Sequence, residues 1–221
     1  MFAPSSACLI MHSFAPGVYA AFRARDLALL DAHRGVYFCL PDAADKIRSA
    51  GSTACWIEPS LAAELEGAGL LARGPGAPAP HLPDKPIRDL RRLSTRTGLL
   101  RNAATWCWAL RAGHRFNRID FAQVIADVQA ARPVPCGADE QNLEPAVAAF
   151  GAILPWLPFQ GQCLYRSYVL LSVLRRCGHD ATLVLGFRTW PFEAHSWLQI
   201  GDLVLDDTVD RLERYTPILA V

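Results

Sequence analysis

The segment from residue 163 to residue 207 constrains the fold most, because one helical pattern is followed there by strand patterns. Residues 164–176, LYRSYVLLSVLRR, form an apolar-rich helical run with two arginines in the last turn. Gly178 follows, which is a common way for a helix to end. Residues 194–200, AHSWLQI, alternate like a strand, and a typical Gly-Asp turn leads into LVLDD at 203–207. The sequence therefore predicts a helix followed by an antiparallel hairpin in the last third of the chain.

Three residues with the side chains of a cysteine hydrolase occupy key positions on these elements. Cys163 stands at or near the N-terminus of the helix, where free N–H groups and the helix dipole lower the pKa of a thiol. His195 lies on the first strand of the hairpin, and pairing across the turn brings Asp206 or Asp207 close to it. In such enzymes a thiolate attacks a carbonyl, an imidazole moves the proton, and a carboxylate orients the imidazole. We therefore predict a triad of Cys163 and His195 with either Asp206 or Asp207 as its carboxylate.

Each of these residues taken singly is more often structural. A buried cysteine usually behaves as a small hydrophobic residue, and the chain has seven cysteines. Cys177, at the end of the same predicted helix, has no base in register and is interpreted as structural. The ordered combination of a helix-start cysteine, a strand histidine and a hairpin aspartate is what favours catalysis.

The same segments resemble the B proteins, which are the leader peptidases of lasso-peptide biosynthesis. The matching stretches are CLYRSYVLLSVLRRCGHDATLVLGFR at 163–188, PFEAHSWLQI at 191–200 and DLVLDD at 202–207. The resemblance implies a transglutaminase-like, papain-related peptidase fold, with the triad roles carried by Cys163, His195 and Asp207. One difference is that Asp206 stands where the family often has Asn, so a second carboxylate competes for the third role.

The N-terminal part reads as a small sheet with helices. Residues 18–23, 26–32 and 35–40 alternate as three consecutive strands. Residues 42–51 are predicted to form a helix that begins near Pro41-Asp42, and residues 59–67 a second helix with a proline in its first turn.

This arrangement resembles the leader-recognition domain of ribosomal peptide pathways, which is winged-helix-like and related to the small protein of pyrroloquinoline quinone synthesis. The run DLALLD at 26–31 followed by GVYFCL at 35–40 carries the resemblance. In that family the precursor's leader adds as a strand along the third strand and also packs against the last helix. The resemblance thus implies a leader-binding set of Gly35, Val36, Tyr37, Phe38, Cys39, Leu61 and Leu65.

A proline-rich stretch separates the two parts. Residues 72–86, ARGPGAPAPHLPDKP, carry five prolines and are interpreted as a semi-rigid linker. We predict an α+β protein with a winged-helix-like recognition domain at 1–71, consisting of a three-stranded sheet plus helices. The linker at 72–86 then leads to a transglutaminase- or papain-like cysteine peptidase domain at 87–221.

The region between the linker and Cys163 is basic and helical. Residues 84–155 hold ten basic and seven acidic residues, a net charge of +3, and helices are predicted over 118–132 and 138–154. Such a basic region is usually a solvated helical surface. The alternative is that it binds an acidic stretch of the substrate. Gln160 or Gln162, just before Cys163, is expected to donate a hydrogen bond to the oxyanion.

Composition excludes several classes of protein. No apolar run reaches the 18 or so residues that a membrane span needs, and the N-terminus has no basic segment of the kind that opens a signal peptide. The odd, scattered cysteines argue against a disulfide framework or a zinc site and favour a reducing cytoplasm, here a bacterial one. A net charge of +1 gives no case for nucleic-acid binding.

Together these observations predict a peptidase that binds the leader of a lasso-peptide precursor and cleaves it from the core before macrolactam formation. No metal or other cofactor is expected. The resemblance also implies a partner cyclase, similar to asparagine synthetase, that uses ATP to form the macrolactam. Two alternatives stay open: a non-catalytic leader-binding scaffold for that cyclase, and a transglutaminase-like acyl transferase or amidase that uses the same triad.

Overall fold

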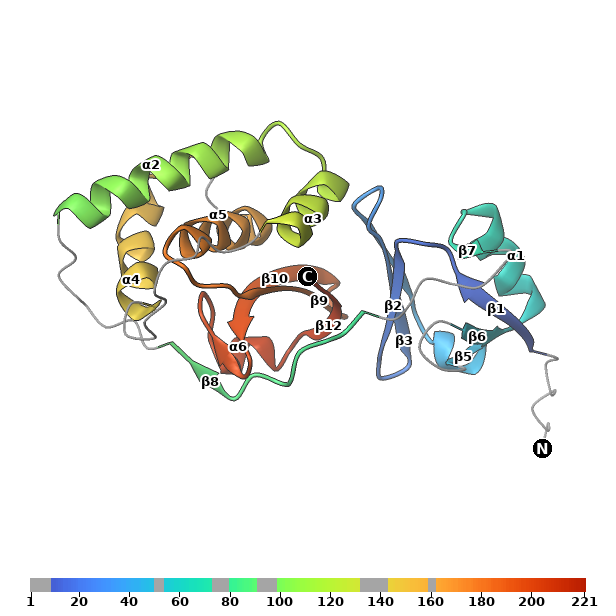
Figure 1. Ribbon diagram of the computed structural model, residues 1–221. Helices are drawn as coiled ribbons and strands as arrows, with labels where there is room; N and C mark the ends of the chain where they lie inside the picture. Colours follow the sequence, from blue (N-terminus) through green and yellow to red (C-terminus); the bar gives the residue numbers. More distant parts are fainter. Residues whose placement is uncertain (1–8, 50–53, 73–79, 91–98, 132–142, 159–161) are drawn as a thin grey trace.

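The chain has a mixed α/β architecture (Figure 1). The computed structural model describes residues 9–49, 54–72, 80–90, 99–131, 143–158 and 162–221. Short strands dominate up to residue 72, and helices around a five-stranded sheet make up the rest. No helix within the described ranges is both long and apolar enough to cross a membrane.

Two small antiparallel sheets form the N-terminal part, with strand orders β2-β3-β4 and β5-β6-β1-β7. The elements are β1 (Ile10–Phe14), β2 (Val18–Arg23), β3 (Asp26–Asp31), β4 (Val36–Leu40), the 3-10 helix η1 (Ala43–Asp45), β5 (Ile47–Ser49), β6 (Ala54–Ile57), α1 (Pro59–Gly67) and β7 (Leu71–Ala72). The three consecutive strands predicted over 18–40 are confirmed, and so is the helix that begins at Pro59.

Strand β3 is buried on both faces, which explains its nearly continuous apolar sequence. Leu27 and Leu29 face a core shared with α1 and the second sheet. Ala28 and Leu30 face the opposite way and pack against side chains of the C-terminal part. This small sheet is therefore a layer between two cores.

The helix predicted over 42–51 is wrong. Asp42 has a left-handed backbone with φ of 50°, the short turn η1 follows, and the chain then enters β5, which pairs with β6. Ile47 is fully buried in that strand pair, so tertiary pairing overrides the local helical preference. The described N-terminal residues thus hold two sheets and one α-helix rather than one sheet with several helices. The winged-helix-like description stays a prediction.

The C-terminal part is built around a sheet with the strand order β12-β9-β10-β11-β8. Its elements are β8 (Arg88–Asp89), α2 (Leu99–Phe116), α3 (Phe121–Ala130), α4 (Leu143–Ile153), the 3-10 helix η3 (Leu154–Trp156), α5 (Cys163–Arg176), β9 (Thr182–Arg188), β10 (Glu193–Ile200), β11 (Leu203–Val204), α6 (Val209–Leu212) and β12 (Thr216–Ala220). The helices predicted within 118–132 and 138–154 are present as α3 and α4, with residues 132 and 138–142 outside the described ranges.

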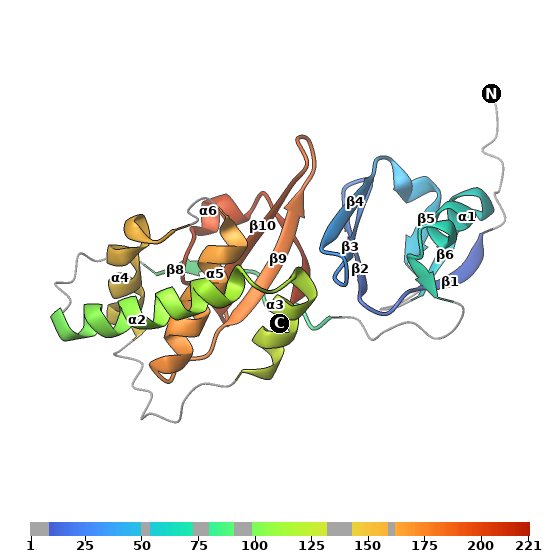
Figure 2. The same cartoon turned by 90° about the horizontal axis from the view of Figure 1, so that it is seen from above.

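Helix α5 lies at the centre of the main core. Val169, Leu170 and Val173 are almost completely buried, and this core also contains side chains of α2, α4 and the sheet. Figures 1 and 2 show α5 between the sheet on one side and α2 with α4 on the other. Since α5 is enclosed in this way, its first residue, Cys163, has a fixed position.

The two parts of the chain touch through the β2-β3-β4 sheet, which lies beside β12 in both views (Figures 1 and 2). Arg23 Nη1 donates a hydrogen bond of 3.1 Å to Thr216 Oγ1, and Trp190 Nε1 donates one of 2.8 Å to Asp26 Oδ2. Of the proline-rich segment, residues 73–79 lie outside the described ranges and 80–86 have no regular secondary structure. The predicted boundaries of the domains and linker stay predictions.

Candidate active site

Cys163 is the first residue of α5. The preceding residue, Gln162, has an extended backbone (φ −93°, ψ 117°), so the helix begins abruptly at the cysteine. The first N–H groups of a helix have no partner within it and carry a partial positive charge. The thiol therefore lies in an environment that favours its anion.

His195 lies on β10, where only 3% of its surface is exposed. The predicted hairpin is confirmed, because β10 turns at Gly201-Asp202 and pairs antiparallel with β11. Asp207 follows β11, and its Oδ2 lies 2.7 Å from His195 Nε2. Its other oxygen, Oδ1, accepts a hydrogen bond of 2.8 Å from the N–H of Thr208. With Nε2 bound to the carboxylate, the Nδ1 side of the ring is left to face the thiol.

The thiol and the imidazole shift each other's protonation. Burial alone would raise the pKa of Cys163, but hydrogen bonds with His195 and Ser196 outweigh it and lower that pKa to about 7. Burial alone would lower the pKa of His195, yet hydrogen bonds with Asp207 and Cys163 raise it. Near neutral pH this pair favours a thiolate next to an imidazolium.

Asp206 and Asp207 face different partners, although they are adjacent in the sequence. Asp206 Oδ2 accepts a hydrogen bond of 2.8 Å from the Ser167 hydroxyl, and its Oδ1 accepts one of 2.8 Å from the N–H of Leu198. Burial raises the pKa of Asp206, although Arg166, whose Nε lies 3.5 Å from Oδ2, acts to lower it. The structure therefore brings Asp207 to His195 and places Asp206 as a tie between α5 and β10.

Sequence reasoning missed two arginines beside the carboxylate. Arg166 Nη2 lies 3.7 Å and Arg211 Nη1 3.5 Å from Asp207 Oδ2. Burial alone would raise the pKa of Asp207, but its contacts with His195 and Thr208, together with the charge of Arg211, lower it. The spacing contained part of the signal, because Arg166 follows Cys163 by three residues on the same helix and therefore lies on the same helical face. Arg211 lies on α6, which begins two residues after Asp207.

A cavity of about 270 Å³ opens next to these groups. Its lining residues are Leu154, Gln162, Cys163, Tyr165, Arg166, His195 and Arg211. Of the two predicted oxyanion donors, Gln162 lies on this cavity and Gln160 lies outside the described residues. A substrate carbonyl in the cavity would meet the thiol and the imidazole together.

The predicted leader-binding residues occupy two different environments. Gly35, Val36, Tyr37, Phe38 and Cys39 lie on or next to β4, which is an edge strand, and no described strand pairs with its outer edge.

The two leucines of that set do not share the edge of β4. Leu61 and Leu65 are buried in the core beneath Phe38, with 7% and 5% of their surface exposed. Because their side chains pack in the core, they are not available for direct contact with a bound peptide. We therefore restrict the expected binding surface to β4.

The edge strand β4 lies near the candidate active site. The ring centroids of Tyr37 and Phe192 are 6.1 Å apart, and Phe192 belongs to the turn that leads into the His195 strand. Burial, with a further contribution from the charge of Cys163, raises the pKa of Tyr37. Tyr37 of the N-terminal sheet thus lies within reach of the charge of the nucleophile.

The lowered thiol pKa predicts a specific pH dependence. The rate at which iodoacetamide alkylates Cys163 is expected to rise with pH through a midpoint at about 7, because the thiolate is the reactive form. In His195→Gln the midpoint moves to higher pH, since glutamine is uncharged and the positively charged donor that stabilises the thiolate is lost. Mass spectrometry of the peptide containing Cys163 measures the rate. Cys55 is an internal control, because burial raises its pKa to about 11. An unchanged midpoint in the variant would contradict the contact.

No group of three or more His, Cys, Asp or Glu side chains that could hold a metal ion occurs within the part of the chain that the structure describes.

Comparison with known proteins places the C-terminal part of the chain in a family. The sequence model of the family described as "Transglutaminase-like superfamily" matches residues 106–220, which include Cys163, His195 and Asp207. The microcin J25-processing protein McjB of Escherichia coli is 36% identical over 63 residues, or 28% of this chain. The matched part spans 30% of that protein's own length. No solved structure gives a significant match.

Proposed function

The chain belongs to the transglutaminase-like superfamily, and on this premise we propose that it is a cysteine peptidase that cleaves the leader from a lasso-peptide precursor. The observation that carries the proposal is the contact of Cys163, His195 and Asp207 beside an open cavity. The similarity to McjB, whose name describes it as a processing protein of microcin J25, supports this substrate class.

Each of the three residues has a distinct role in the proposed reaction. The Cys163 thiolate attacks the carbonyl carbon between leader and core, and a tetrahedral oxyanion forms. The His195 imidazolium then protonates the leaving amine, which is the N-terminus of the core, and a thioester with the leader stays on the enzyme. His195, now neutral, takes a proton from water, which hydrolyses the thioester. Asp207 keeps the ring oriented throughout, and the pKa directions given above agree with these roles.

The oxyanion needs two donors in such a mechanism. The N–H of Cys163 is one candidate, because it belongs to the first turn of α5 and has no helical partner. The Gln162 side chain, which lies on the cavity, is the second, and Gln160 stays an alternative.

We further propose that the leader adds as a strand to the edge of β4. The two-residue turn Ala24-Arg25 makes Arg23 and Asp26 a hydrogen-bonded pair, and such pairs alternate along an antiparallel ladder. Continuing this alternation, Phe38 bonds to β3, whereas the N–H and C=O groups of Tyr37 and Cys39 point to the open edge. A bound strand would satisfy those groups.

This geometry predicts that Cys39→Pro weakens leader binding about tenfold, because one outward N–H is lost and the proline ring obstructs an added strand. The matched control is Cys39→Ala, which removes the thiol and keeps the N–H, and which should bind like the unchanged protein. Fluorescence anisotropy with a labelled leader peptide measures both. If the two variants bound the leader with equal affinity, the leader would not bind along this edge of β4.

The proposed partners are the precursor peptide and a cyclase. Cleavage exposes the α-amino group of the core, and macrolactam formation consumes that amine. We therefore expect an ATP-dependent cyclase, similar to asparagine synthetase, to act next, and we expect both steps in the bacterial cytoplasm.

A cleavage assay tests the function directly. The protein is incubated with the precursor encoded beside its gene, with and without the cyclase, in water labelled with heavy oxygen, and the products are weighed by mass spectrometry. A leader fragment that carries heavy oxygen at its new C-terminus supports hydrolysis. A leader joined to an added amine would indicate an acyl transferase instead. Leader binding without any fragment would indicate a scaffold.

A further inference from the structure

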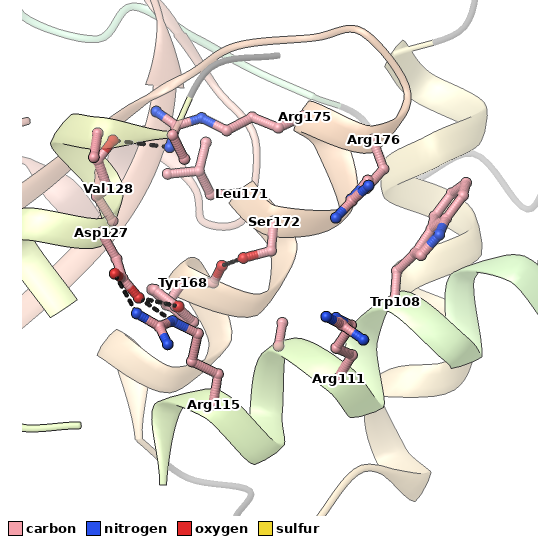
Figure 3. Close-up of a pocket in the computed structure, with 13 residues that line it drawn as sticks. Trp108, Arg111, Arg115, Asp127, Val128, Tyr168, Leu171, Ser172, Arg175 and Arg176 are labelled. Carbon is pink, nitrogen blue, oxygen red and sulfur yellow. Dashed lines mark hydrogen bonds and ion pairs between the residues drawn. The ribbon is translucent and has the colours of Figure 1, made fainter. Parts of the chain in front are cut away.

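A second pocket lies at the other end of α5 from Cys163. It has a volume of about 540 Å³ and is bounded by α2, the end of α3 and the last two turns of α5 (Figure 3). It shares no lining residue with the cavity at Cys163. Nothing in the proposed peptidase reaction uses it.

Four arginines line this pocket, and two of them are paired. Arg115 Nη2 donates to Asp127 Oδ1 at 2.6 Å, and the Tyr168 hydroxyl donates to the same carboxylate at 3.1 Å. Arg175 Nε donates to Asp180 Oδ1, and its Nη1 donates to the Val128 carbonyl oxygen, both at 2.8 Å. These two guanidinium groups therefore belong to the structure of the pocket.

The other two arginines, Arg111 and Arg176, are exposed, and their guanidinium groups have no ion pair or hydrogen bond with any residue that the structure describes. Both point into the pocket, Arg111 from α2 and Arg176 from α5 (Figure 3). Among the described residues that line the pocket, Asp127 is the only carboxylate, and it already pairs with Arg115. Counted over these described lining residues, two positive charges have no counter-charge.

Apolar side chains stand beside these charges. Trp108 lies next to Arg111 and Arg176, and Leu171 lies deeper on the wall formed by α5 (Figure 3). A lone phosphate ion would leave most of such a volume empty. An acidic peptide offers both carboxylates for the guanidinium groups and aliphatic carbons for the indole.

We propose that this basic pocket, defined by Trp108, Arg111, Leu171 and Arg176, docks a glutamate- or aspartate-rich segment of a partner polypeptide. Guanidinium groups bind carboxylates through two parallel hydrogen bonds. Two arginines from different helices would therefore bind two acidic side chains of the same segment. The proposal is independent of the peptidase reaction, because no residue of the pocket lies at Cys163.

The test uses the full chain and a labelled hexaglutamate peptide, with hexaglutamine as the neutral probe and inorganic phosphate as the free anion. The unchanged protein is expected to bind hexaglutamate at low salt and to lose it at high salt, because screening weakens such contacts. The double variant Arg111→Gln/Arg176→Gln should bind about tenfold more weakly.

A matched double variant controls for net charge. Arg48 and Arg118 are exposed and lie outside the pocket, so Arg48→Gln/Arg118→Gln removes the same charge and should leave binding unchanged. Thermal unfolding establishes that all three proteins are folded. Equal losses in both double variants, equal binding of hexaglutamine, or full competition by phosphate at micromolar concentration would each overturn the proposal. The last result would indicate a small-anion site instead.

Discussion

Replacing Cys163 with alanine is expected to abolish cleavage of the precursor, with a loss of at least about 10⁴-fold in kcat. The sulfur supplies the electron pair that attacks the carbonyl, and alanine has nothing in its place. Leader affinity should not change, because β4 and Cys163 belong to different elements. Single-turnover cleavage followed by mass spectrometry gives the rate, and anisotropy with the labelled leader gives the affinity.

Cys107→Ala is the matched control for this result. Cys107 is an exposed cysteine on α2 and lines neither the cavity at Cys163 nor the basic pocket. Its replacement should leave both rate and affinity as they are. Cleavage that persisted in Cys163→Ala would mean that another group is the nucleophile, and the proposed reaction would have to be abandoned.

Asp207→Asn is expected to lower kcat by about 10³-fold or more while the fold stays intact. An amide in place of the carboxylate loses the charge that stabilises the His195 imidazolium, and it can hold the ring in the wrong tautomer. The pH dependence of the remaining activity should also change, because the pKa of His195 is raised in part by Asp207.

Asp206→Asn is the informative comparison, because the two positions are adjacent and the substitution is the same. Its carboxylate binds Ser167, Leu198 and Arg166, so its loss should reduce the free energy of unfolding by about 3 kcal/mol. The rate of the folded fraction should fall far less than in Asp207→Asn. Denaturant unfolding and cleavage assays at low temperature separate the two effects. Equal losses of kcat in Asp206→Asn and Asp207→Asn would contradict the assignment of Asp207 as the triad carboxylate.

Local chemistry explains why much of the candidate site was predictable. A helix that starts at Cys163 and a hairpin that turns at Gly201-Asp202 are set by neighbouring residues, so their patterns are visible in the sequence. The choice between Asp206 and Asp207 was not visible. The choice is made only when the hairpin packs. The Asp207 carboxylate then lies against His195, whereas the Asp206 carboxylate binds Ser167 of α5 and the N–H of Leu198.

Other features depend on contacts that the sequence does not display. The second sheet forms because Ile10 pairs with Ile57, and a short strand with a partner 47 positions away has little local signature. The segment after Asp42 has helical composition, yet Ile47 becomes fully buried as part of a strand. Leu61 and Leu65 have the expected helical spacing, but only the packed structure shows that they face inward.

The cluster in which Ala28 and Leu30 meet Phe187 and Ile218 has a thermodynamic consequence. Because one core draws side chains from both parts of the chain, unfolding either part exposes apolar surface of the other, and we expect the two parts to unfold together. Any ligand that binds the native sheet therefore raises the unfolding free energy of the whole molecule by linkage. The proposed binding of a leader at β4 would thus also stabilise the strand that carries His195, and we expect leader binding to raise the thermal stability of the peptidase part.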